Sequence, residues 1–156
     1  MGRQSDKTAQ VIRRQAIALL ALVGLLVATY LWLYKIGVLG ELKCGTGSCE
    51  YVQTSPYAEV FGVPVAFIGV VGYAILFLIG LAGVQPRFAA DRRVTVLLAL
   101  LATVGFGFTL YLTAIELLVL HAICRWCVGS AVIITAIWTL ALAGLIRTPS
   151  AAAPTR

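Results

Sequence analysis

Charged residues are scarce in this sequence. Asp, Glu, Lys and Arg supply only 12% of its 156 residues, acidic side chains number six, and histidine occurs once. Hydrophobic residues make up 61% of the chain and its mean hydropathy is +0.99, values that exclude an ordinary water-soluble domain. The composition therefore predicts a protein that resides in the lipid bilayer.

Four apolar runs lack a Lys or Arg at their centres, where each such residue would cost about 3 kcal/mol in a membrane. A transmembrane helix needs about 20 apolar residues, and the runs that qualify are residues 16–34, 64–84, 94–120 and 128–146. Because lipid offers no partners to backbone groups, each run should be a helix. We expect an all-α membrane protein, in which residues 16–146 form a four-transmembrane-helix bundle. Residues 1–15 and 147–156 should be tails whose ends are frayed.

Basic residues are distributed unevenly between the two sides of this bundle. Nine lie on the side of the tails: Arg3, Lys7, Arg13, Arg14, Arg87, Arg92, Arg93, Arg147 and Arg156. Three lie on the other side: Lys35, Lys43 and Arg125. The positive-inside rule therefore predicts cytoplasmic tails and an extracytoplasmic loop at 35–63. Membrane orientation accounts for the net charge of +6, so we expect the bilayer, and no nucleic acid, as its partner.

Four cysteines form two pairs on the predicted extracytoplasmic side. Cys44 and Cys49 flank a glycine-rich turn in the 35–63 loop, and Cys124 and Cys127 form a Cys-Arg-Trp-Cys motif before the fourth helix. Disulfides form and persist outside the cytoplasm. The positive end of a helix stabilises a thiolate, and a two-residue spacer lets the sulfurs alternate between dithiol and disulfide. The pattern predicts thiol–disulfide electron transfer.

Other interpretations of these residues are open at the level of sequence. The four thiols approximate zinc-ligand spacing, which a metal-binding membrane protein or small transporter would use, and two inert disulfides are a further alternative. Trp126 lines a pocket or anchors its helix at the interface. Glu116 is an ionisable residue inside a predicted helix and hence a functional candidate, or it pairs with a bundle hydroxyl. His121 shuttles protons or is a plain interfacial residue.

Two stretches resemble bacterial members of the vitamin K epoxide reductase family. One begins at Cys49 and continues through Thr54-Ser55-Pro56-Tyr57 and Phe61-Gly62-Val63-Pro64 to Gly69, Gly72 and Tyr73; the other is Cys124-Arg125-Trp126-Cys127-Val128-Gly129-Ser130-Ala131. The combination of a loop pair, a following Ser, a Gly-x-Pro and a later Cys-x-x-Cys is specific, although each piece alone is weak. The resemblance extends from the first to the fourth predicted helix.

The resemblance implies roles for individual residues. Cys44 exchanges with a partner, Cys49 attacks the disulfide at Cys124, Cys127 reduces a quinone, and Ser55 helps to hold the active arrangement. The implied quinone site contains Cys127, Trp126, Ala131 and Tyr73. Ala131 stands where animal members carry Tyr, and the second predicted helix lacks their Asn, so epoxide chemistry is not implied.

The resemblance also implies partners and a location. The cofactor is menaquinone or ubiquinone from the membrane pool, and the electron donor is a separate thioredoxin-fold thiol oxidase. The protein is then expected in a bacterial inner membrane with its cysteines facing outward.

Overall fold

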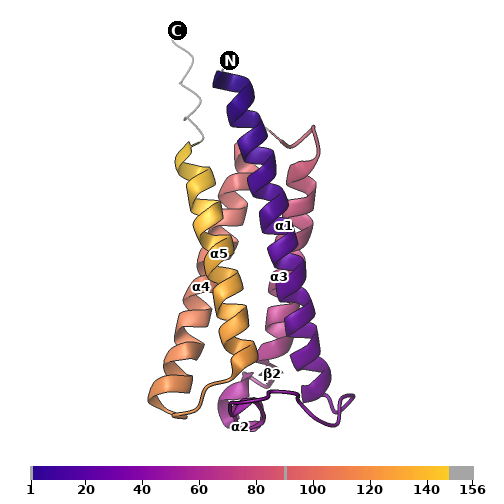
Figure 1. The fold of residues 1–156 in the computed structure, drawn as a ribbon, viewed down its shortest axis with the longest axis vertical. Helices are drawn as coiled ribbons and strands as arrows, with labels where there is room; N and C mark the ends of the chain where they lie inside the picture. The colour runs from indigo at the N-terminus through magenta and orange to yellow at the C-terminus, as the bar shows by residue number, and fades with distance from the viewer. Residues whose placement is uncertain (1, 90, 148–156) are drawn as a thin grey trace.

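The computed structural model describes residues 2–89 and 91–147. Four long helices run side by side: α1 (Gly2–Lys35), α3 (Val65–Val84), α4 (Arg92–Leu118) and α5 (Arg125–Arg147) (Figure 1). Each is long and apolar enough to cross a membrane. The predicted all-α bundle of four membrane spans is confirmed, and the chain is a multi-pass membrane protein.

Helix α1 is longer than the sequence indicated. The predicted frayed N-terminal end is wrong, because the helix already begins at Gly2 and no proline interrupts it. Arg14 helps to fix this part, since the residue is only 3% exposed and its guanidinium bonds across the bundle. It donates to the carbonyls of Gly83 (2.8 Å), Phe88 (2.6 Å) and Asp91 (2.9 Å) and to Thr95 Oγ1 (3.0 Å). Of the predicted C-terminal tail, residues 148–156 lie outside the described residues.

Small residues let α1 approach α3 closely. A side chain at Gly24 would overlap the ring of Tyr73, and a Cβ at Gly80 would lie 3.3 Å from the Cα of Ala18. Close backbone approach of this kind is the usual role of small residues between membrane helices. The contact places Tyr73 inside the bundle, where the residue is 6% exposed.

The connection between α1 and α3 is folded rather than extended. It contains α2 (Cys49–Thr54), the short helix η1 (Pro56–Ala58), and an antiparallel pair, β1 (Glu59–Val60) and β2 (Val63–Pro64), with Val60 opposite Val63. Phe61 and Gly62 turn the hairpin with positive φ angles of 52° and 78°, as a tight two-residue hairpin requires. In Figure 1 this segment and the α4–α5 connection lie at one end of the bundle, and α1 begins and α5 ends at the other.

Candidate active site

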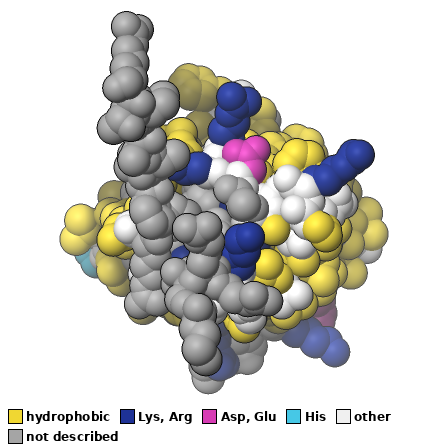
Figure 2. Space-filling model, turned by 90° about the horizontal axis from the view of Figure 1, so that it is seen from above, with side chains coloured by type: hydrophobic (Ala, Val, Ile, Leu, Met, Phe, Trp, Pro, Cys, Tyr) yellow, Lys and Arg dark blue, Asp and Glu magenta, His cyan; other side chains and the backbone are white. Residues whose placement is uncertain are grey.

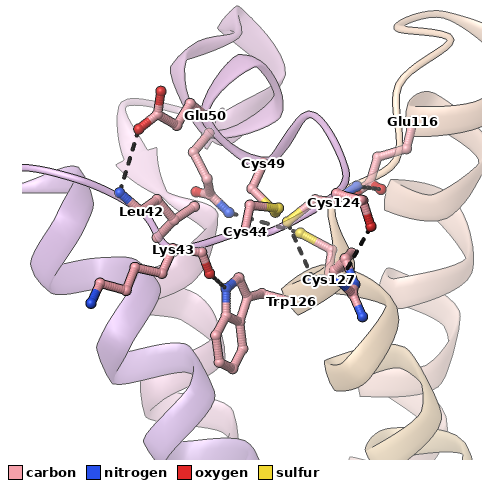
Figure 3. The surroundings of a disulfide bond; sticks show 12 residues. Leu42, Lys43, Cys44, Cys49, Glu50, Glu116, Cys124, Trp126 and Cys127 are labelled. Atoms are coloured by element: carbon pink, nitrogen blue, oxygen red, sulfur yellow. Dashed lines mark hydrogen bonds between the residues drawn. A yellow bond between two sulfur atoms is a disulfide. The ribbon is translucent and has the colours of Figure 1, made fainter.

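The two cysteine pairs meet at the end of the bundle that carries α2. Cys44 and Cys49 form a disulfide with their Cα atoms 6.0 Å apart, and Cys124 and Cys127 are free thiols. Cys49 and Cys124 are each 0% exposed and belong to one buried cluster. Figure 3 shows all four sulfurs grouped between the loop and the start of α5. The structure therefore brings together the four cysteines that the sequence singled out.

Backbone geometry fixes the turn between Cys44 and Cys49. Gly45 and Gly47 have φ angles of 67° and 132°, in a region that glycine adopts at little cost. A Cβ at Gly47 would lie 3.1 Å from the carbonyl oxygen of Ile123. The next amide, of Ser48, donates to that same oxygen at 3.1 Å. The residue before Cys49 is thus tied to the residue before Cys124.

Trp126 holds the loop at the residue before Cys44. Its indole Nε1 donates to the carbonyl of Lys43 at 3.1 Å, while the Lys43 amide donates to the hydroxyl of Tyr30 at 3.1 Å. The Tyr30 and Trp126 rings pack with centroids 5.0 Å apart, and Figure 3 shows the indole directed at Lys43. Arg125 Nη1 donates to Thr46 Oγ1 at 3.3 Å. Of the two middle residues of the Cys-Arg-Trp-Cys motif, Arg125 therefore contacts the turn between the other two cysteines and Trp126 contacts the residue just before it.

Glu116 and Gln53 surround the inner pair. The Cys124 amide donates to Glu116 Oε2 at 3.2 Å, and the Cys127 thiol hydrogen-bonds to the same carboxyl group. Gln53 Nε2 lies 3.8 Å from Cys127 Sγ. Both side chains are 7% exposed. The sequence reasoning missed Gln53, although its place four residues after Cys49 puts it one turn further along the same face of α2.

The Cys124 sulfur is surrounded by hydrogen-bond donors. The Cys127 thiol donates to it and the Cys127 amide does so at 3.4 Å. The thiol hydrogen bond, aided by the amide, holds the pKa of Cys124 below its ordinary value, and burial opposes this effect only in part. Donors that favour the charged form lower a pKa in this way. The start of α5 therefore supports a thiolate at Cys124.

A cavity of about 380 Å³ lies inside the bundle, next to Cys127. Its walls are mostly aliphatic and come from α1, α3, α4 and α5. Its polar groups are few: Gln53, Tyr73, Glu116, Cys127 and Ser130, with threonines on α4. The Tyr73 hydroxyl bonds to Ser130, at 2.8 Å from Oγ and 2.9 Å from the carbonyl oxygen. Two of the predicted quinone-site residues, Tyr73 and Cys127, thus line one cavity.

A second cavity, of about 550 Å³, lies between α4 and α5. Ala131 lines this one and not the first, so the structure separates it from Tyr73. Thr113, Glu116 and Cys127 line both cavities. Glu116 and Cys127 therefore lie in the wall between the two cavities.

Three predicted residues take positions that change their interpretation. Trp126 is not among the described residues that line either cavity, and its indole donates to the carbonyl of Lys43 in the loop; its place at the quinone stays a prediction. Ser55 Oγ donates to the Val52 carbonyl at 2.7 Å and ends α2, so it shapes the loop and bonds to backbone. His121 is exposed in the α4–α5 connection, with a φ of 49°.

These features define a membrane-embedded protein in which two cysteine pairs meet beside an apolar cavity. The sequence matches the family model described as vitamin K epoxide reductase family over residues 15–142. The chain belongs to the vitamin K epoxide reductase family, a family of membrane disulfide oxidoreductases and quinone reductases. The resemblance that the motifs predicted is confirmed.

Proposed function

We propose that this chain is a quinone-dependent thiol oxidase that supports disulfide formation outside the cytoplasm. Electrons pass from a thioredoxin-fold partner to Cys44 and Cys49, then to Cys124 and Cys127, and finally to menaquinone or ubiquinone. The main support is the burial of Cys49 with Cys124 in one cluster, while Cys127 lines the adjacent cavity. The domain that does this is residues 16–146.

The exposure of the four sulfurs supports the order of the relay. Cys44 is partly exposed, so a partner thiolate attacks its sulfur, breaks the Cys44–Cys49 bond and frees Cys49. Buried Cys49 then attacks Cys124 in its oxidised pair and frees Cys127 at the cavity wall. The partner's second thiol then attacks the partner–Cys44 bond, so that the partner leaves oxidised and Cys44 is free. Cys44 next attacks Cys49 and releases Cys124, which leaves the inner pair as a dithiol. Each exchange moves two electrons inward and restores the outer disulfide.

The first cavity suits a quinone headgroup. Ligand cavities are mostly apolar with a few placed polar groups, and here the polar groups gather around Cys127. Cys127 would face the ring, and the Tyr73 hydroxyl and the Gln53 amide would bond to its oxygens. A bound quinone supplies an acceptor for two electrons and two protons. The bundle supplies a space shielded from water beside the thiol that reacts.

We also propose the orientation that charge predicts, with both tails cytoplasmic and the cysteines outside a bacterial inner membrane. Figure 2 looks onto the end of the bundle where α1 begins and shows Lys and Arg side chains around it. The four cysteines lie at the opposite end. An extracytoplasmic position gives Cys44 access to an oxidative folding partner.

The relay is tested by trapping its intermediate. In Cys127→Ser, Cys124 has lost its own partner, so we expect a stable Cys49–Cys124 disulfide in non-reducing peptide mass spectrometry. A dominant Cys44–Cys124 link would reverse the roles of the loop cysteines. Copurifying quinone, at about one per chain, supports the cofactor assignment. Stoichiometric metal in place of quinone would favour the alternative of a metal-binding membrane protein or small transporter.

A further inference from the structure

Glu116 is a buried carboxyl group within a membrane-spanning helix. It is 7% exposed, lies in α4 two residues before that helix ends, and lines both cavities. Ionisable residues in such positions are expensive and usually functional. The relay of cysteines described above does not use it. Among the described residues that line the first cavity, it is also the only carboxyl group.

The contacts of Glu116 join it to the reacting sulfurs. Its carboxyl group accepts the Cys124 amide at 3.2 Å and bonds to the Cys127 thiol, while the Gln53 amide approaches Cys127 from α2. From these contacts we infer that Glu116 is a catalytic residue, which takes the Cys127 proton and delivers it to a quinone oxygen. This inference rests on the proposed function.

The proton and electron balance requires such a carrier. The inner pair starts as two thiols and ends as one disulfide, and it gives up two electrons and two protons. Cys127 passes its proton to the Glu116 carboxylate as its sulfur donates the electron pair to the acceptor. Cys124 closes the S–S bond, and Glu116 gives its proton to the nearer quinone oxygen and returns to its starting state. Cys124 releases its proton to solvent when it forms the thiolate, and the other quinone oxygen takes one proton from solvent, so the two protons lost by the thiols equal the two gained by the quinol.

Neighbouring polar groups do not replace this function. The Tyr73 hydroxyl and the Gln53 amide can hydrogen-bond to a quinone oxygen, but neither side chain gives up a proton in the physiological range. His121 lies exposed in the connection after α4. Glu116 also lines the second cavity, where the side-chain hydroxyl groups come from Thr113, Thr135 and Thr139.

The test uses the full-length protein in detergent, reduced beforehand and mixed with menadione, a short naphthoquinone. Glu116→Gln keeps the shape and removes the proton acceptor. We expect its single-turnover reduction of menadione to fall about 100-fold, the usual scale for losing a general acid–base group. Glu41→Gln, which removes an exposed carboxyl in the loop, is the control. It should react like the wild type.

Two further measurements separate proton transfer from a structural role. Menadione affinity, read from tryptophan fluorescence, and trapping of Cys49–Cys124 in a Cys127→Ser background should both be unchanged by Glu116→Gln. Acetate added to Glu116→Ala should restore reduction, because the small acid can enter the vacated space, and acetamide should not. Reduction by Glu116→Gln within threefold of the wild-type rate would overturn the inference, as would loss of menadione binding or trapping. A wild-type protein that cannot reduce menadione would contradict the proposed function itself.

Discussion

Each cysteine pair contains one fully buried sulfur and one that is open to a partner. Cys49 and Cys124 are 0% exposed, whereas Cys44 is partly exposed and Cys127 lines the cavities. Exchange between the pairs can therefore occur out of contact with water. The two remaining sulfurs are accessible at different places, Cys44 at the surface of the loop and Cys127 at the wall of the cavities.

The pKa of Cys124 provides a prediction at this scale. The Cys127 thiol is the main group that lowers it, so Cys127→Ala should raise the pKa and move thiolate formation to higher pH. Cys127→Ser keeps a hydrogen-bond donor and should remain closer to the original midpoint. Thiolate absorbance is titrated in a Cys44→Ser/Cys49→Ser background, where Cys124 is the only thiol of each Cys127 variant and the reference protein carries only Cys124 and Cys127. An unchanged or lower midpoint in Cys127→Ala would contradict this account.

Gly47 offers a second residue-scale prediction. Its φ of 132° is strained for other residues, and a Cβ there would lie 3.1 Å from the Ile123 carbonyl. Gly47→Ala should destabilise the docked turn by about 2 kcal/mol and slow oxidation of a protein dithiol at least tenfold. Gly40→Ala is the matched control, because nothing lies within 4 Å of its Cβ and its φ is not positive. Equal rates for the two variants would show that the turn is not held in this way.

At the scale of elements, the connection between α1 and α3 is positioned by the start of α5. Ile123, Arg125 and Trp126 each hydrogen-bond to the loop, at Ser48, Thr46 and Lys43. The contacts come from residues beside and between the inner cysteines. Three hydrogen bonds therefore link the segments that carry the two cysteine pairs.

Removing one of these bonds should weaken the docking of the loop. Trp126→Phe retains an aromatic ring against Tyr30 but loses the bond to Lys43, which contributes about 1 kcal/mol, or roughly fivefold in the docked population. The yield of the Cys49–Cys124 link in a Cys127→Ser background should fall accordingly. Trp138→Phe removes an indole N–H bonded to Thr103, away from the loop, and serves as the control. Equal yields would argue against a positioning role for Trp126.

The sequence predicted those features of the fold and the site that leave a local pattern of residues. The four spans followed from apolar length alone, and the pairing of cysteines followed from spacing. The position of Trp126 did not, because an indole at an interface is compatible with a cavity or a loop, and only the bond to Lys43 decides between them. Gln53 and Glu116 reach Cys127 from α2 and α4. Such contacts between distant elements leave no local pattern in a sequence.

At the scale of the whole molecule, the two ends of the bundle differ. One end holds the cysteines, the cavities and the folded connection. At the other end Arg14 donates to one carbonyl in the last turn of α3 and to two in the connection after it. A buried carbonyl group without a hydrogen-bond partner destabilises the folded state. The Arg14 guanidinium donates to three carbonyl groups at once. The bonds of Arg14 therefore join α1 to α3 and to the α3–α4 connection at the end away from the cysteines.

Arg14 should therefore matter for stability more than for electron transfer. Arg14→Leu leaves three carbonyls without this donor and should lower the free energy of unfolding by about 3 kcal/mol, measured by thermal unfolding in detergent. Arg92→Gln removes a positive charge from an exposed position at the same end and should have little effect. Similar losses for both variants would show that net charge matters here, rather than the bonds of Arg14.

The last prediction concerns how the whole bundle sits in the membrane. Nine basic residues on the side of the tails against three beside the cysteines predict that Cys44 faces outward. After mild reduction of intact cells, a membrane-impermeant maleimide should label Cys44, which is partly exposed, ahead of buried Cys49. A single cysteine introduced at Arg87, in the α3–α4 connection, should stay unlabelled until the membrane is permeabilised. The opposite pattern would place the cysteines in the cytoplasm, where glutathione keeps thiols reduced, and the chain would then have no role in oxidising an extracytoplasmic partner.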